Sequence, residues 1–154
     1  IGMIDIISRP FISADRLACL SIFDSNVPPF FAPEERVEFC EHLENLGAIK
    51  TSYIVLVRGD VVVACGGLTV DMTCRKALLV WGMVERELHG IGLGSILTQA
   101  RLTLARAKPD LTKIELSTSQ HTNGFYERFG FALSKITPNG FGPGLDRLDM
   151  TLEL

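Results

Sequence analysis

The stretch HGIGLGSIL, residues 89–97, places glycine at positions 90, 92 and 94, directly after an apolar run and directly before a helical pattern. Each glycine costs roughly 0.5–1 kcal/mol relative to alanine, so the pattern needs a local reason. The first N–H groups of a helix have no partner within it, and this end carries about half a positive charge. Glycines let an anion approach these groups without meeting a Cβ atom. The stretch therefore predicts a phosphate-binding turn, to which Ser95 adds a hydroxyl.

Two common phosphate-binding loops do not fit these residues. The pattern G-x-G-x-x-G needs glycine at position 95, which is serine, and the preceding strands are expected to form hairpins rather than a β-α-β unit. The P-loop needs G-K-[ST] after the glycines, and that sequence is missing. The residues therefore disfavour a dinucleotide-binding fold and give no support for ATP hydrolysis.

Outward from the glycines, apolar periodicity predicts an α/β protein with the element order βααβββαβαββ, a mixed sheet with helices on its faces. We expect Ser13 to cap the first helix, Gly59-Asp60 to turn a hairpin, and Pro109 to follow the end of the helix after the glycines. The expected strands are 3–8, 51–58, 61–70, 76–84, 113–119, 131–136 and 145–154, the other helices are 13–23, 33–47 and 121–130, and 137–144 is expected to be a loop.

Size and composition indicate one globular domain. The chain has 154 residues, of which 47% are hydrophobic. Ile1 and Gly2 precede Met3 and could be left over from cloning, so the predicted domain spans residues 3–154. A formal charge of -3 with scattered Lys and Arg argues against nucleic acid as a partner. No apolar run approaches the ~20 residues of a membrane span, so we expect no membrane partner and a cytoplasmic location.

Cysteine and histidine spacing does not indicate a metal site. The four cysteines form no C-x-x-C pair and lie in apolar segments, so buried free thiols are expected; they are Cys19, Cys40, Cys65 and Cys74. The three histidines do not pair at a ligand spacing. We therefore predict no bound metal.

Residues 89–94 also match the pattern Q/R-x-x-G-x-G/A except at the first position, where His89 stands. WGMV ends the expected strand eight residues before Gly92, and FYERFGF, residues 125–131, is similar to a family sequence LYEKLGF. With these motifs and its element order, the chain resembles the GCN5-related N-acetyltransferases (GNAT). The resemblance implies a mostly antiparallel sheet that splays apart between the strands 76–84 and 113–119.

The resemblance implies acetyl-CoA as the co-substrate, with pantetheine lying between the splayed strands and pyrophosphate on the glycine turn. The family usually has Arg or Gln at the position of His89, so the charge of an arginine is missing there. A cofactor-contacting Asn of the family falls at Ser119, or at Gln120 if the loop is one residue shorter. The implied binding residues are Gly82, Met83, Val84, His89, Gly90, Ile91, Gly92, Leu93, Gly94, Ser95 and Ser119.

For catalysis, Tyr126 falls on the family tyrosine that protonates the leaving thiolate. A general base or a water relay must also take a proton from the amine. Glu115 is the candidate base, because an acidic residue in a strand covered on both faces should have a raised pKa. Glu85 and Glu87 are alternatives.

The implied reaction is transfer of an acetyl group to a primary amine by direct attack in a ternary complex. The acceptor, a small molecule or a peptide amine, would lie between segments 24–33 and 137–146, where Asp24, Asp71 and Asp146 could attract a cation. Two alternatives stay open: a non-catalytic acyl-CoA sensor, and a transferase that uses another acyl-CoA. The resemblance also allows a homodimer.

Overall fold

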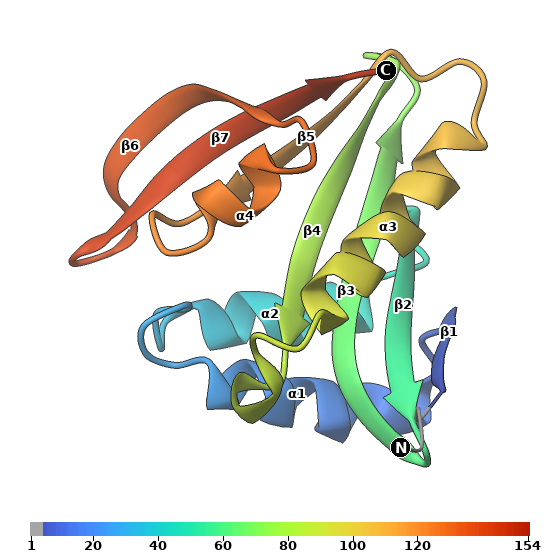
Figure 1. Ribbon diagram of the computed structural model, residues 1–154, viewed down its shortest axis with the longest axis vertical. Coiled ribbons are helices and arrows are strands. Elements are labelled where there is room, and N and C mark those ends of the chain that lie inside the picture. Colours follow the sequence, from blue (N-terminus) through green and yellow to red (C-terminus); the bar gives the residue numbers. More distant parts are fainter. Residues whose placement is uncertain (1–4) are drawn as a thin grey trace.

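The computed structural model describes residues 5–154 and contains one seven-stranded sheet with the order β1-β2-β3-β4-β5-β7-β6 (Figure 1). Only β4 and β5 pair in parallel; the other neighbours are antiparallel. The strands are β1 Ile6–Pro10, β2 Thr51–Arg58, β3 Val61–Asp71, β4 Lys76–Val84, β5 Lys113–Thr118, β6 Ala132–Gly142 and β7 Leu145–Glu153. The helices are α1 Arg16–Ser25, α2 Glu35–Glu44, α3 Leu93–Arg106 and α4 Asn123–Glu127, with 3-10 turns at Ser13–Asp15 and Arg86–Leu88.

Helices cover both faces of the sheet because side chains alternate along each strand. On β2, Tyr53 and Val55 pack against α1 and α2 in one core cluster. Ile54 and Leu56 point the other way and pack with Leu97 of α3. This arrangement confirms the predicted α/β fold with helices on both faces.

The ends of several elements differ from the sequence predictions. Residues 3–4 of the expected first strand lie outside the described residues, and the strand runs on to Pro10. Ser13 makes no side-chain cap; Asp15 instead accepts a hydrogen bond from the Ile12 N–H at 2.9 Å. The expected loop 137–144 is mostly strand, because β6 continues to Gly142 with an irregular pairing to β7.

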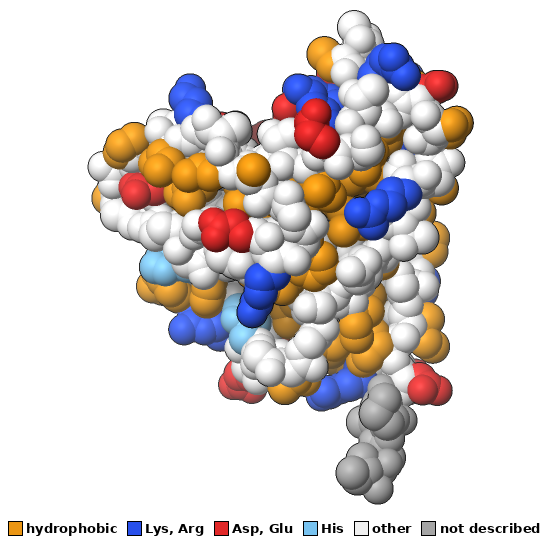
Figure 2. Space-filling view, turned by 45° about the horizontal axis from the view of Figure 1, so that its top comes forward, with side chains coloured by type: hydrophobic (Ala, Val, Ile, Leu, Met, Phe, Trp, Pro, Cys, Tyr) orange, Lys and Arg blue, Asp and Glu red, His pale blue; other side chains and the backbone are white. Residues whose placement is uncertain are grey.

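The surface carries mixed charge and one thiol that we expected to be buried. Cys19 and Cys65 are buried and Cys40 is half-buried, but Cys74 is exposed in the turn between β3 and β4. Figure 2 shows basic and acidic side chains interspersed over the face in view. Within residues 5–154 no helix is long and apolar enough to cross a membrane.

Asp15 fixes the entry to α1, and its removal should destabilise the protein. Its carboxylate is 5% exposed and accepts two hydrogen bonds from Arg9, at 2.8 and 2.9 Å. The Asp15→Ala variant should lose about 2 kcal/mol of unfolding free energy in urea at pH 7, because Arg9 and the Ile12 N–H lose a charged partner. Asp24→Ala, which removes an exposed ion pair to Arg36, is the matched control and should cost less than about 1 kcal/mol.

The same contribution should depend on pH. The hydrogen bond from Arg9 lowers the pKa of Asp15 below its ordinary value. Stability from this group is therefore present above the ordinary aspartate pKa and is lost as the pH falls through the lowered one. The gap between the wild type and Asp15→Ala should close in acid; equal losses in the two variants at pH 7 would contradict this role.

Candidate active site

The two central strands part in the middle of the sheet and leave room for a ligand. β4 and β5 pair only from Lys76↔Lys113 to Leu79↔Leu116, after which the strands diverge (Figure 1). A cavity of about 920 Å³ opens at this point, lined by β4, β5, the glycine turn, α3, α4 and the segment before α2. The sheet therefore splays at the strands that the resemblance implied.

A β-bulge shapes the cavity side of β4. Two residues of β4, Trp81 and Gly82, lie opposite Gly66 alone on β3. Trp81 has a φ of 47°, and its carbonyl accepts a 2.8 Å hydrogen bond from the Tyr53 hydroxyl. An extra residue bends a strand locally, so the bulge turns β4 away from β5.

The three glycines of the turn have two different structural reasons. Gly90 and Gly92 have φ values of 85° and 95°, a left-handed conformation that favours glycine, and a Cβ atom there would meet nothing. Gly94 is helical, and its missing Cβ would contact the Phe125 ring at 3.4 Å. Gly92 precedes the first residue of α3, and no side chain caps that helix. The first N–H groups of α3 are thus left for another partner.

Not every residue of the predicted phosphate turn faces the cavity. Gly90, Gly92, Gly94 and Ser95 line it, whereas Ile91 is 60% exposed and Leu93 is buried in the core. The side chains of Ile91 and Leu93 therefore do not contribute to the cavity wall.

His89 is tied to the end of β4. Its Nε2 lies 2.8 Å from the Val84 carbonyl, to which the Nε2–H tautomer donates, and its ring contacts Phe30 at 5.1 Å between centroids. Asn26 donates to the same carbonyl at 2.9 Å. The Val84 carbonyl is therefore occupied within the protein, while Gly82 and Met83 also line the cavity.

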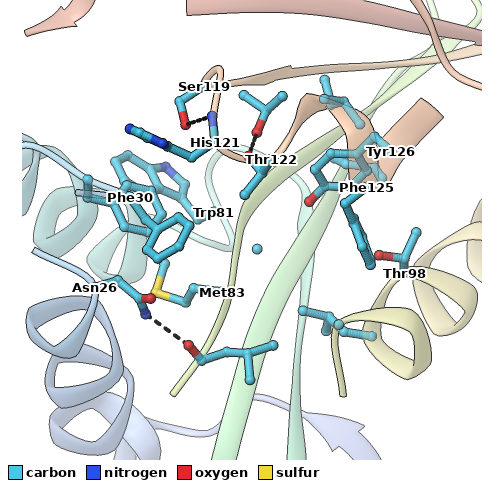
Figure 3. A pocket seen from close by; sticks show the side chains of 18 of the residues that line it. Asn26, Phe30, Trp81, Met83, Thr98, Ser119, His121, Thr122, Phe125 and Tyr126 are labelled. Atoms are coloured by element: carbon cyan, nitrogen blue, oxygen red, sulfur yellow. Dashed lines mark hydrogen bonds between the residues drawn. The ribbon is translucent and has the colours of Figure 1, made fainter. Parts of the chain in front are cut away.

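Ser119 and Gln120, the two candidates for the family Asn, have different surroundings. Ser119 is 4% exposed, lines the cavity, and accepts a hydrogen bond from the His121 N–H (Figure 3). Gln120 instead binds the β6–β7 turn through the Gly144 carbonyl and the Asp146 N–H. Of the two, only Ser119 contributes to the cavity wall.

Tyr126 lies on α4 at the side of the cavity opposite Phe30 and Trp81 (Figure 3). Phe125 and Phe131 pack edge-on against its ring, with centroids at 5.0 and 6.0 Å. Within residues 5–154 no hydrogen bond engages its hydroxyl, which is directed into the cavity in Figure 3. This hydroxyl is available to a ligand.

Glu115 does not line the cavity, and the expectation of a raised pKa is wrong. Its carboxylate pairs with Lys76 at 2.9 Å and Lys113 at 3.3 Å. The hydrogen bond from Lys76 is the main reason that the pKa of Glu115 is lowered. The parallel pairing with β4 brings Lys76 to this carboxylate, whereas Lys113 lies two residues away on β5 itself. Glu85 and Glu87 also lie outside the cavity wall.

The cavity instead has two carboxylates that the sequence analysis did not select, Glu35 and Glu38 of α2. Glu35 is 7% exposed, and its Oε2 accepts a 2.8 Å hydrogen bond from the Ala32 N–H. Burial raises the pKa of Glu35 to about 7. In the sequence these residues follow Pro33 like ordinary acidic residues at a helix start, so no local signal distinguished them.

Residues of both segments that we expected to flank an acceptor line the cavity, but the three aspartates predicted to attract it do not. Phe30 and Phe31 from segment 24–33 and Phe141 from segment 137–146 line the cavity. The three aspartates expected to attract an amine, Asp24, Asp71 and Asp146, lie outside this wall. Within residues 5–154 no group of three His, Cys, Asp or Glu side chains is placed to hold a metal ion.

Comparison with known proteins agrees with this geometry. The family model described as "Acetyltransferase (GNAT) family" matches residues 18–131. The chain belongs to this family, and its class as an acetyltransferase enzyme follows from that membership. No curated protein matches the sequence significantly.

Solved structures show the same fold at low sequence identity. A protein assigned to the GNAT acetyltransferases of Desulfovibrio desulfuricans has 22% identity and a TM-score of 0.81, covering 97% of this chain and 99% of that one. The ribosomal-protein-S18-alanine N-acetyltransferase of Escherichia coli has 17% identity and a TM-score of 0.79, with 97% and 94% covered. A Salmonella typhimurium structure described with its cofactor acetyl-CoA has 18% identity and a TM-score of 0.75, with 97% and 94% covered.

The left-handed turn gives a direct test of the phosphate site. Gly92→Ala should weaken CoA binding at least tenfold in calorimetry, because a Cβ at this φ costs about 1–2 kcal/mol and displaces the free N–H groups. Gly47→Ala, whose Cβ would meet nothing and whose φ is not left-handed, is the matched control and should bind CoA like the wild type. Unchanged affinity in Gly92→Ala would remove the turn from the binding site.

Proposed function

We propose that the protein transfers an acetyl group from acetyl-CoA to a primary amine by direct attack in a ternary complex. The observation that carries this proposal is the continuity of one cavity from the free N-terminus of α3, past the unpaired part of β4, to the carboxylates of α2. A phosphate, an extended arm and an amine would thus each meet matching chemistry along one path.

The chain's own groups define how acetyl-CoA would be held. The N–H groups of residues 90–95 would bind the pyrophosphate, and the open edge of β4 at Gly82 and Met83 would pair with the pantetheine amides. Ser119 would add a hydroxyl from the opposite strand end. Bound there, acetyl-CoA supplies an activated thioester. The Salmonella structure described with acetyl-CoA shares this fold, which supports the choice of co-substrate.

Proton movement is the main task left to side chains. An amine with a pKa near 10.4 needs about 4.6 kcal/mol to be deprotonated at pH 7, at roughly 1.36 kcal/mol per pKa unit. We assign the acceptance of this proton, directly or through water, to Glu35, the buried carboxylate of the cavity wall.

In the covalent step, bonds form and break only between the two substrates. The amine nitrogen attacks the thioester carbonyl, a C–N bond forms, and the C–S bond breaks. Tyr126 gives its hydroxyl proton to the departing thiolate and regains one from solvent. Among residues 5–154 no cysteine lines the cavity, which favours direct attack over an acyl-enzyme.

The acceptor would bind on the α2 side as a cation. Glu35 and Glu38 offer negative charge there, and the wall beside them includes the rings of Phe31 and Trp81. A small-molecule amine and a peptide N-terminus both fit these features. The Escherichia coli relative is named for an alanine of a ribosomal protein, which supports the peptide class.

Tyr126→Phe should separate chemistry from binding. Loss of the acid should lower kcat by about 10²-fold while the Kd for acetyl-CoA changes less than about threefold, because the ring packing against Phe125 and Phe131 is kept. Stopped assays of thiol release and calorimetry measure the two quantities. An unchanged kcat would remove Tyr126 from the acid role, and binding without turnover across a broad amine panel would favour the sensor.

Ionisation of Glu35 should make kcat/KM depend on pH. Since its pKa is raised to about 7, the active carboxylate form fills as the pH rises, so kcat/KM should increase through pH 7. Glu35→Gln should lose this rise while its amide oxygen still accepts the Ala32 N–H. Glu41→Gln, at an exposed position of α2, is the matched control. A retained rise in Glu35→Gln would assign the proton to another group.

A further inference from the structure

Arg101 of α3 is a buried cation without a partner. It is 1% exposed, and within residues 5–154 neither a hydrogen bond nor a salt bridge engages its guanidinium; its Nε is fully enclosed. The other two arginines that line the cavity differ, since Arg147 pairs with Asp149 and Arg128 lies over the Phe125 ring. A buried, unpaired charge is costly, so a counter-charge is missing at Arg101.

The sheet is shaped to receive this guanidinium. Gly82 and Gly66 meet at the bulge, and both face α3. A Cβ at Gly82 would lie 2.6–2.9 Å from three guanidinium atoms of Arg101, and one at Gly66 would lie 3.2 Å from its Cζ. A side chain at Gly82 would therefore force the guanidinium to move from its present position. The space that the Arg101 guanidinium occupies thus exists because Gly66 and Gly82 have no side chains.

A second unpartnered donor lies one turn earlier on the same helix. The Thr98 side chain is 1% exposed, its Oγ1 has no partner, and it lines the cavity beside Phe125 (Figure 3). Residues three apart share one face of a helix, so Thr98 and Arg101 point into the same region. The two carboxylates of the wall come from α2, which packs on the other face of the sheet. Within residues 5–154, the α3 side of the cavity therefore presents these two donors and no carboxylate.

The phosphates of CoA cannot fill this site. Arg101 lies nine residues after Gly92, which places it about 13 Å along the helix axis from the turn. It is instead level with Gly82, on the part of β4 that leads to the closed end of the splay at Leu79 and Leu116. A co-substrate with its pyrophosphate on the turn and its pantetheine along Met83 and Gly82 would place its acyl end at or just beyond this depth, and an acetyl group has no charge to offer.

We propose that Thr98 and Arg101 bind a carboxylate at the end of the acyl chain, so that the protein uses carboxyacyl-CoA thioesters in addition to acetyl-CoA. This inference rests on the proposed acyl transfer and extends it to a second class of donor. The amine nitrogen bonds to the thioester carbonyl, the C–S bond breaks, and CoA leaves as the thiol. The distal carboxylate does not react and stays ionised, paired with the Arg101 guanidinium.

Succinyl-CoA and butyryl-CoA provide a matched pair, because their acyl chains have equal length and differ in the terminal carboxylate. Calorimetry should show that the wild type binds succinyl-CoA at least tenfold more tightly than butyryl-CoA, and kcat/KM should favour succinyl-CoA similarly. In Arg101→Met this ratio should fall to one or below. Arg106→Met, at an exposed position of α3, should keep the wild-type ratio.

Stability supplies an independent readout. Without ligand, Arg101→Met should melt at or above the wild-type temperature, because an unpaired buried charge is replaced by an apolar chain. A marked fall in melting temperature with an unchanged binding ratio would mean a structural role and would overturn the proposal. Should Arg101→Met fail to fold, Thr98→Val should still reduce the succinyl preference at least threefold, and no reduction would overturn the proposal.

The remaining outcomes distinguish this inference from the proposed function. Equal binding of succinyl-CoA and butyryl-CoA overturns it, while turnover of acetyl-CoA with an amine leaves acetyl transfer intact. Absence of turnover with every donor overturns the proposed function, and the binding ratio still decides whether the carboxylate site exists. The carboxylate that binds Arg101 could instead belong to the acceptor. In that case Arg101→Met would raise the KM for an amino acid but not for its decarboxylated amine, and the ratio of succinyl-CoA to butyryl-CoA binding would stay unchanged. This result would overturn the assignment to the acyl chain.

Discussion

The end of the β4–β5 pairing after Leu79 and Leu116 is the constraint on which the site depends. Beyond this pair, no strand within residues 5–154 lies between β4 and β5, so the backbone groups on their facing edges are open to an extended ligand. The β-bulge at Trp81 bends β4 away from β5, and the Tyr53 hydroxyl holds that bend through the Trp81 carbonyl. The glycine turn then brings the free end of α3 to the mouth of the gap, so the bulge and the turn together form the slot and its anion site.

The chemistry of the cavity is divided between the two faces of the sheet. Carboxylates and aromatic rings come from α2 and the segment before it, which suit an ammonium group. Hydroxyl and guanidinium donors come from α3 and α4, which suit the acyl donor. The cavity at the splay reaches both sides of the sheet, so the two proposed substrates would meet there. This division supports the proposed direct attack, in which each substrate would be held by its own side of the protein.

The sequence predicted the local features of the site and missed those made by distant pairing. Gly90 and Gly92 were identifiable because a left-handed turn before a helix is a property of neighbouring residues. Glu115 was misjudged because Lys76, from another strand, lies beside it only once β4 and β5 pair. Arg101 and Glu35 carried no local signal; on a helical wheel each is an ordinary polar residue, and burial against the sheet alone makes it unusual.

By itself, the sequence determined the order of the elements, the helices on both faces, and the phosphate-type turn, because periodicity and glycine conformations act over a few residues. Only the tertiary structure decided which carboxylates face the cavity, which serine or glutamine lines it, and where a buried cation lies without a partner. Those properties depend on desolvation and on charges contributed by distant segments. The same carboxyl group has a raised pKa at Glu35 and a lowered one at Glu115, and only the surroundings differ.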